Sequence, residues 1–276
     1  MAIFPSYYDA KDVGEVRLER ADEVAAEATR CRQQGELRGA DEDRFRIAAL
    51  GIDCQLGFCS PAGSLFVPGA VEDSRRAVEW IYRNLETITA LHFSLDTHRV
   101  FQIFHPAWWR DAEGRPPAPL TPIRAEDVRS GRYRAVMAPA ESLEYCERLE
   151  AGGKLVLTIW PYHTLLGGVS HALEPALMEA ALFHSLVRQT PTHFTSKGEA
   201  PETENYSILS PEVCELGGRA VGRFDEELFA RLISYDRVYV FGQAKSHCVL
   251  ATLDDLRRRA EAKGGRVLLD KIWILE

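Results

Sequence analysis

The chain has 276 residues, of which 46% are hydrophobic and 27% charged, and its formal net charge at pH 7 is −8. These values are ordinary for a globular protein with one large core, and without a basic stripe they argue against nucleic-acid binding. The sequence has no apolar run of about 18 residues that would predict a membrane span, and no signal-peptide pattern. Because the six cysteines lack a disulfide-framework spacing, we expect free thiols and a cytoplasmic location.

Predicted strands and helices alternate along most of the chain. A polar N-terminal extension (1–45) with one amphipathic helix (16–33) is expected before a single domain (46–276). Apolar runs predict strands at residues 46–53, 90–95, 154–159, 192–198, 237–240 and 264–276, and helical spacing predicts helices at 71–89, 173–187, 225–233 and after 249. Residues 99–139, rich in Pro, Trp and Arg, are expected to form an irregular insertion. The alternation predicts a three-layer α/β sandwich with a mainly parallel central sheet and helices on both faces.

Cys248 lies where a predicted strand turns into a helix. Gly242 breaks the strand, and leucines at helical spacing follow the cysteine. The free N–H groups and positive dipole end of a helix N-terminus lower the pKa of a thiol and can hold an oxyanion. The position therefore predicts a nucleophilic cysteine with a low thiol pKa, although a lone cysteine that opens a buried helix is more often a small apolar residue.

Two other strand ends carry side chains that fit the same chemistry. Asp53 ends the strand at 46–53, and Lys197 ends the strand at 192–198. Function gathers at the carboxyl ends of strands in an open α/β sheet, so these side chains and Cys248 are expected to meet as base, cation and nucleophile. Taken singly, the aspartate could cap a helix and the lysine could be solvated surface.

Five segments in order resemble the motifs of the isochorismatase-like cysteine hydrolases, and within them the nicotinamidases. They span residues 53–69 (DCQLGFC, then GSLFVPG), 96–98 (DTH), 160–167 (WPYH, then G), 197–207 (KG, then ENYS) and 242–249 (GQA, then CV). The resemblance runs from about residue 47 to the C-terminus. Lys245 and Ser246 depart from the Thr-Asp that is usual there, and Thr164 and Gly168 also depart from the family pattern. In spite of these departures we expect the reaction type of the family, but the identity of the substrate stays open.

The resemblance implies roles for residues of the nucleophile segment and its surroundings. Asp53, Lys197 and Cys248 would be the catalytic triad, and the backbone N–H groups of Ala244 and Cys248 would form the oxyanion hole. The Gln243–Ala244 peptide would be cis. Three side chains would contact a flat substrate: Phe58, Trp160 and Gln243. Alternatively, Phe58 and Trp160 are ordinary residues of the hydrophobic core.

A metal site is predicted from Asp96 and His98, which end one strand, and His163, which follows another. One carboxylate and two imidazoles suit Zn²⁺, Fe²⁺ or Mn²⁺ and leave positions open for water or substrate. His105, in the loop that follows, is a further candidate ligand. The D-x-H pattern alone is weak evidence, and the W-P-x-H segment at a second strand end strengthens it.

The resemblance implies a nicotinamidase-like amidohydrolase that converts a small planar amide to an acid and ammonia through a thioester. Two alternatives stay open. One is a metal-free cysteine hydrolase acting on a carbamoyl or ureido compound or a vinyl ether, and the other is a non-catalytic member that binds a ligand or partner. The expected partners are a small-molecule amide and further copies of the chain in a homo-oligomer, but neither nucleic acid nor a membrane.

Overall fold

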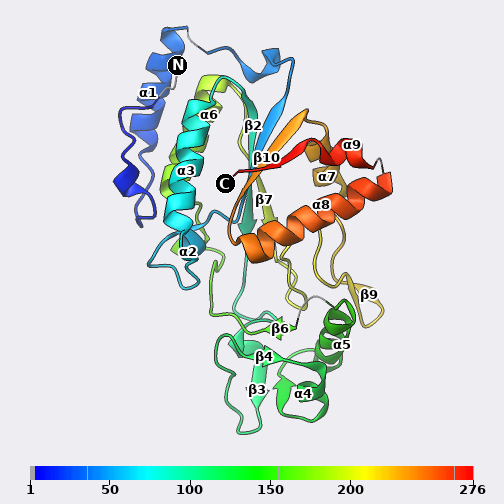
Figure 1. Ribbon diagram of the computed structural model, residues 1–276. Coiled ribbons are helices and arrows are strands. Elements are labelled where there is room, and N and C mark those ends of the chain that lie inside the picture. The colour runs from blue at the N-terminus through cyan, green and yellow to red at the C-terminus, as the bar shows by residue number, and fades with distance from the viewer. Residues whose placement is uncertain (1–3, 36, 154–155, 264, 276) are drawn as a thin grey trace.

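A computed structural model describes residues 4–35, 37–153, 156–263 and 265–275 of the chain. At its centre lies a five-stranded sheet in the order β11-β10-β1-β2-β7 (Figure 1). All four strand pairings are parallel, which confirms the predicted mainly parallel sheet. The strands are β1 (Ile47–Ile52), β2 (Ile88–Asp96), β7 (His193–Lys197), β10 (Arg237–Gly242) and β11 (Ile272–Ile274).

Helices cover both faces of the sheet and complete the predicted three layers (Figure 1). One face carries α1 (Ala21–Gln33), α3 (Ala70–Arg83) and α6 (Pro175–Arg188), and the other carries α7 (Glu226–Ile233), α8 (Leu250–Lys263) and α9 (Arg266–Leu269). The side chains of β1 alternate between the two faces, as a strand's period of two requires. Ala49 packs into the core under α3 and α6, whereas Leu50 and Ile52 pack into the core on the other face.

The N-terminal segment packs against α6 through two partly buried ion pairs to one buried carboxylate. The Arg17 and Arg20 guanidinium groups both donate to the carboxylate of Glu179, which is 1% exposed. The backbone N–H of Arg20 also donates to Glu179, at 2.8 Å. Helix α1 begins only at Ala21, so the predicted start at residue 16 is wrong.

The predicted irregular insertion has regular structure and a core of its own, so that expectation is wrong. Within residues 99–139 lie β3 (Trp109–Asp111), β4 (Pro122–Ile123), α4 (Ala125–Arg129) and β5 (Tyr133–Ala135). The unit extends beyond the predicted end at 139, because α5 (Pro139–Ala151) and β6 (Leu157–Thr158) pack in the same core. Trp108 and Trp109 are almost fully buried and pack with Tyr145 of α5, which supplies the apolar area that the insertion needs to fold. Figure 1 shows this unit beyond the carboxyl edge of the central sheet.

Two predicted strands differ from the structure. The strand expected at 154–159 is only β6, which pairs antiparallel with β4 of the insertion and not with the central sheet; Lys154 and Leu155 lie outside the described residues. The strand expected at 264–276 is shorter, because α9 precedes β11; Gly264 and Glu276 lie outside the described residues.

The remaining short elements are α2 (Leu56–Cys59), which follows β1, and a hairpin of β8 (Glu215–Leu216) and β9 (Arg219–Ala220). None of the described helices is long and apolar enough to cross a bilayer.

Candidate active site

The residues predicted as base, cation and nucleophile lie together at the carboxyl edge of the sheet. Asp53 follows β1, Lys197 ends β7, and Cys248 lies in the turn after β10. The Nζ atom of Lys197 lies 3.0 Å from Oδ2 of Asp53 and 3.7 Å from Sγ of Cys248. All three residues are buried. The parallel sheet thus brings three distant parts of the sequence to one point.

The nucleophile turn, residues 242–249, needs a glycine at its start. Gly242 has a φ of 126°, and a Cβ at this position would overlap the carbonyl group of Ile52. The missing side chain therefore lets the end of β10 approach the end of β1 closely. The Gln243–Ala244 peptide is cis, which confirms the geometry implied by the family resemblance. Lys245–Val249 then form a π-helical turn that leads into α8.

One lysine lies between two buried carboxylates. The Nζ atom of Lys197 is also 2.8 Å from Oδ1 of Asp96. Burial lowers the pKa of the Lys197 ammonium, but the two carboxylates outweigh burial and hold this pKa well above its usual value. Burial also raises the pKa of Asp53 in spite of the ammonium. For Asp96, His98 and Lys197 outweigh burial and hold the pKa well below its usual value. Asp53 is therefore the better proton acceptor of the two carboxylates.

The pKa of the Cys248 thiol differs from the sequence prediction. Burial raises this pKa well above its usual value; Lys197 lowers it, but Asp53 and Asp96 raise it further. A thiolate would add a third negative charge beside two carboxylates that share one ammonium. The sequence predicts a low thiol pKa because Cys248 lies at a helix N-terminus. That prediction is wrong when the burial and the charges of the surrounding side chains are included. These groups favour the neutral thiol over the thiolate.

A carboxylate and two imidazoles converge beside Lys197. The ligand atoms of Asp96, His98 and His163 all lie within 4.8 Å of one another, and all three residues are buried. Nε2 of His98 lies 2.8 Å from Oδ2 of Asp96, and Nε2 of His163 lies 3.5 Å from the same oxygen. Nδ1 of His163 donates a hydrogen bond to the carbonyl oxygen of Pro161 at 2.7 Å. That bond leaves the lone pair of His163 on Nε2, which faces the carboxylate.

The surroundings of this group fit a divalent cation. Burial lowers the pKa of His98, which favours the neutral imidazole that a metal requires. At Gly198, a Cβ would lie 2.9 Å from Cε1 of His98, so the absence of a side chain leaves room for the ring. The donor set of one carboxylate and two imidazoles suits Zn²⁺, Fe²⁺ or Mn²⁺.

The fourth predicted ligand, His105, lies beside the group but not within it. Its ring centroid is 5.7 Å from that of His98, and its Nδ1 donates to the carbonyl oxygen of Arg99 at 2.9 Å. Burial lowers the pKa of His105 to about 3. Its Nε2 is buried and has no hydrogen-bond partner among the described residues.

A pocket of about 210 Å³ opens onto both Cys248 and the Asp96–His98–His163 group. Phe58 and Trp160 both line this pocket. The Phe58 ring packs edge-on against His163 at 5.5 Å, and the Trp160 ring packs edge-on against His247 at 5.7 Å. Apolar walls with a few converging polar groups are typical of a small-molecule site.

Glu204 and Tyr206, also in the pocket wall, hold the indole of Trp160. Nε1 of Trp160 donates to Oε1 of Glu204 at 2.7 Å and lies 3.2 Å from the hydroxyl of Tyr206. Burial raises the pKa of Glu204 to about 8. The ENYS motif marks this segment in the sequence, but a loop has no periodic pattern from which the burial of a glutamate could be predicted.

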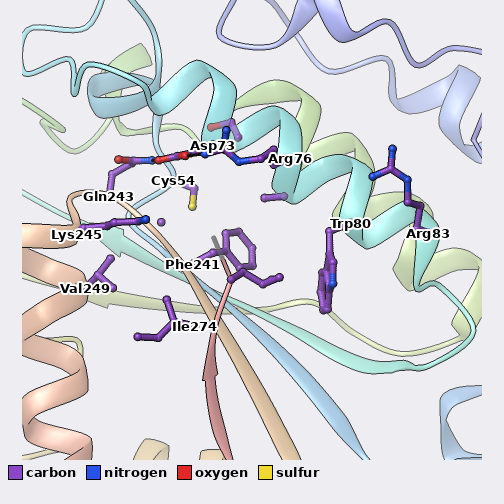
Figure 2. Close-up of a pocket in the computed structure, with 14 residues that line it drawn as sticks. Cys54, Asp73, Arg76, Trp80, Arg83, Phe241, Gln243, Lys245, Val249 and Ile274 are labelled. Atoms are coloured by element: carbon purple, nitrogen blue, oxygen red, sulfur yellow. Dashed lines mark hydrogen bonds and ion pairs between the residues drawn. The ribbon is translucent and has the colours of Figure 1, made fainter.

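Gln243 does not face this pocket, contrary to its predicted contact with the substrate. The backbone is extended at Ala244, whose side chain lines this pocket, whereas the side chains on either side of it, Gln243 and Lys245, do not. Nε2 of Gln243 donates to Oδ2 of Asp73 at 3.3 Å. Gln243 and Lys245 line a second pocket between the nucleophile turn and α3 (Figure 2).

Ser94 and Gln55 are buried polar residues that hold Asp53 and Asp96 in place. Neither residue is assigned a role from the sequence. The Ser94 hydroxyl donates to Oδ1 of Asp53 at 2.6 Å and accepts from the Asp53 backbone N–H at 2.9 Å. Gln55 receives a hydrogen bond from the Asp96 N–H at 2.7 Å and donates to the Asp96 carbonyl at 3.0 Å. A serine within the apolar run of β2 is the signal that could have identified Ser94.

Comparison with known proteins gives a match at the level of structure. No family model and no curated protein matches the sequence. The structure is similar to a yeast nicotinamidase bound to the inhibitor nicotinaldehyde, with a TM-score of 0.54, 15% identity and coverage of 83% of this chain and 99% of that chain. A nicotinamidase and pyrazinamidase from Acinetobacter baumanii has a TM-score of 0.51, 17% identity and coverage of 79% and 80%. The chain therefore has the fold of the isochorismatase-like hydrolases, to which these nicotinamidases belong.

Proposed function

We propose that the protein hydrolyses a small planar amide, of the nicotinamide type, to the acid and ammonia, with Cys248 as the nucleophile. The observation that carries this proposal is one pocket that joins the Asp53–Lys197–Cys248 group to the Asp96–His98–His163 group. The fold shared with the yeast and Acinetobacter baumanii nicotinamidases supports it.

The reaction begins with proton transfer from the neutral Cys248 thiol to Asp53, whose pKa burial has raised. The sulfur then attacks the amide carbonyl carbon. Lys197 stays protonated between its two carboxylates and offsets the charge that passes to the sulfur. The backbone N–H groups of Ala244 and Cys248 receive the oxyanion, and the loss of one such donor typically costs about 3–4 kcal/mol of transition-state stabilisation.

Asp53 returns the proton to the leaving nitrogen, so the C–N bond breaks and ammonia departs. A thioester on Cys248 remains, and Asp53 can then take a proton from the water that hydrolyses it. Phe58 and Trp160 would hold a flat substrate between their rings. A divalent cation bound by Asp96, His98 and His163 would supply a Lewis-acid contact for a ring nitrogen of the substrate.

An ammonia-release screen over nicotinamide, pyrazinamide and small ureido compounds tests this proposal, with metal analysis of the same sample. We expect release from nicotinamide or pyrazinamide by metal-loaded protein. Cys248→Ala should abolish it, whereas Cys214→Ser, at an exposed cysteine that is not part of the pocket lining, should retain it. Turnover of ureido compounds alone, without bound metal, would favour a metal-free hydrolase. No turnover of any amide would favour a ligand-binding role.

A further inference from the structure

The second pocket lies directly behind the nucleophile turn and has a composition of its own. Side chains of one short segment divide between the two cavities: Ala244, Ser246, His247 and Cys248 line the substrate pocket, whereas Gln243, Lys245 and Val249 line the second pocket. The volume of the second pocket is also about 210 Å³. Pockets for drug-sized ligands typically measure about 300 Å³ or more. A cavity of about 210 Å³ is smaller and therefore suits a molecule of one or two rings.

One part of the lining consists of apolar side chains, two of which are aromatic. Trp80 of α3 and Phe241 of β10 supply aromatic faces, and Ile274 and Leu275 close the edge next to β11. Figure 2 shows Phe241 in the middle of the pocket, between Trp80 at one end and Lys245 at the other. The Trp80 ring packs against Tyr239 at a centroid distance of 5.0 Å, which fixes the position of the indole.

The charged part of the lining is mainly cationic. Arg76, Arg83 and Lys245 are the cationic residues among those that line the pocket, against the single carboxylate of Asp73. Arg76 forms an ion pair with Asp73, to which Gln243 also donates. Arg83 forms an ion pair with Glu79 of the same helix at 2.7 Å. Each arginine therefore has a carboxylate partner, but both side chains are about half exposed and keep further N–H donors for an anion. Figure 2 shows that Lys245 reaches into the pocket from the nucleophile turn, towards α3.

From this pairing of flat aromatic faces with a cationic rim, we propose that the second pocket binds a small aromatic anion. The ring would pack on Phe241 and Trp80, and the anionic group would bind at the Lys245 end of the pocket, to Lys245 and Arg76. Arg83, about two turns further along α3 than Arg76 and beyond Trp80, would add positive potential without contacting that group. Guanidinium groups bind carboxylate and phosphate in the same two-pronged geometry, so the shared chemistry is a planar ring with either oxyanion. This site is separate from the substrate pocket and does not depend on the proposed reaction.

Ligand-observed NMR titrations test the proposal with 2-naphthoate, 2-naphthyl phosphate, inorganic phosphate and the uncharged 2-naphthalenemethanol. Full-length Cys248→Ala protein is used, so that no probe is consumed. We expect 2-naphthoate or 2-naphthyl phosphate to bind at least tenfold more tightly than the uncharged alcohol and than inorganic phosphate. A comparison of 2-naphthoate with 2-naphthyl phosphate, which share the same ring, identifies the carboxylate or the phosphate as the preferred head group.

Substitutions in α3 assign the binding to this pocket. Arg76→Gln combined with Arg83→Gln should weaken binding of the aromatic anion at least tenfold, and Trp80→Ala should weaken it as well. Arg75→Gln is the matched control, because Arg75 is an exposed arginine of the same helix that is not part of the lining. Equal binding by the double variant and the wild type would overturn the proposal, and so would equal binding of the aromatic anions and the uncharged alcohol.

Discussion

The ammonium of Lys197 lies 2.8 Å from a carboxylate oxygen of Asp96, so the lysine that pairs with Asp53 also contacts a residue of the candidate metal group. The two groups of the site are therefore electrostatically one unit. A change at either group alters the charge balance that the other experiences.

Removal of the shared cation should reduce both stability and activity. Lys197→Met leaves two buried carboxylates without their common partner, and breaking a buried ion pair typically costs about 3–5 kcal/mol. We expect a loss of that size in the free energy of unfolding, measured in urea at pH 7. Asp53→Asn combined with Lys197→Met should recover part of the stability but none of the activity. A double variant less stable than Lys197→Met would contradict this charge balance.

The cysteines should differ in reactivity in an order that follows burial. Burial raises the pKa of the thiols of Cys54, Cys59 and Cys248, whereas Cys214 is exposed. In metal-free protein at pH 7, iodoacetamide should modify Cys214 before Cys248, as measured by peptide mass spectrometry. Cys214→Ser should remove the fast phase. If the fast phase persists and maps to Cys248, the thiol is more acidic than its surroundings indicate.

Metal binding should depend on His163 and on the space beside His98. His163→Ala removes one of three ligands and should abolish stoichiometric Zn²⁺ binding, measured by elemental analysis after dialysis. Gly198→Ala should weaken Zn²⁺ binding, because its Cβ would displace the His98 ring. The control is His171→Ala, since His171 bonds to Thr97 and lies outside the metal group. Equal loss of zinc in the control would argue against the assignment of these ligands.

Glu204 should make the stability of the protein depend on pH. Burial raises its pKa from 4.5 to about 8, so between these values the folded protein holds a proton that the unfolded chain has released. Glu204 makes its full contribution to the free energy of unfolding below about pH 4.5. That contribution is lost as pH rises through 8, which lowers the free energy of unfolding by about 3–5 kcal/mol. Urea titrations from pH 5 to 8 should show the unfolding free energy of wild type falling relative to Glu204→Gln. A constant difference would mean that Glu204 is ionised throughout.

Lys245 should not discriminate substrates by charge, because its side chain lines the second pocket. The ratio of kcat/KM for nicotinamide to kcat/KM for a carboxylated analogue should therefore be the same in wild type and Lys245→Thr, within about twofold. A shift of tenfold or more in this ratio would place the ammonium in the substrate pocket instead.

The central sheet could be predicted from the sequence because strand ends are local features. Asp53 follows the apolar strand β1 and Lys197 ends the short strand β7, and parallel pairing through β2 then brings both to one edge. The insertion could not be predicted, since two-residue strands such as β4 and β6 have no detectable period and become strands only by pairing with each other. The thiol pKa of Cys248 was missed for a related reason. It depends on the sum of charges from three strands, and no single segment of sequence contains that sum.

Trp160 packs partly against the core of the central domain and partly against the core of the insertion. It follows β6 with His163, whereas Cys248 and Lys197 are fixed by strands of the central sheet. The Trp160 wall of the pocket thus depends on two cores, whereas the residues proposed to react are held by the central sheet. Mutations in the insertion can change which molecules fit while the reacting atoms keep their positions, so substrate range can diversify in evolution at little cost to the chemistry.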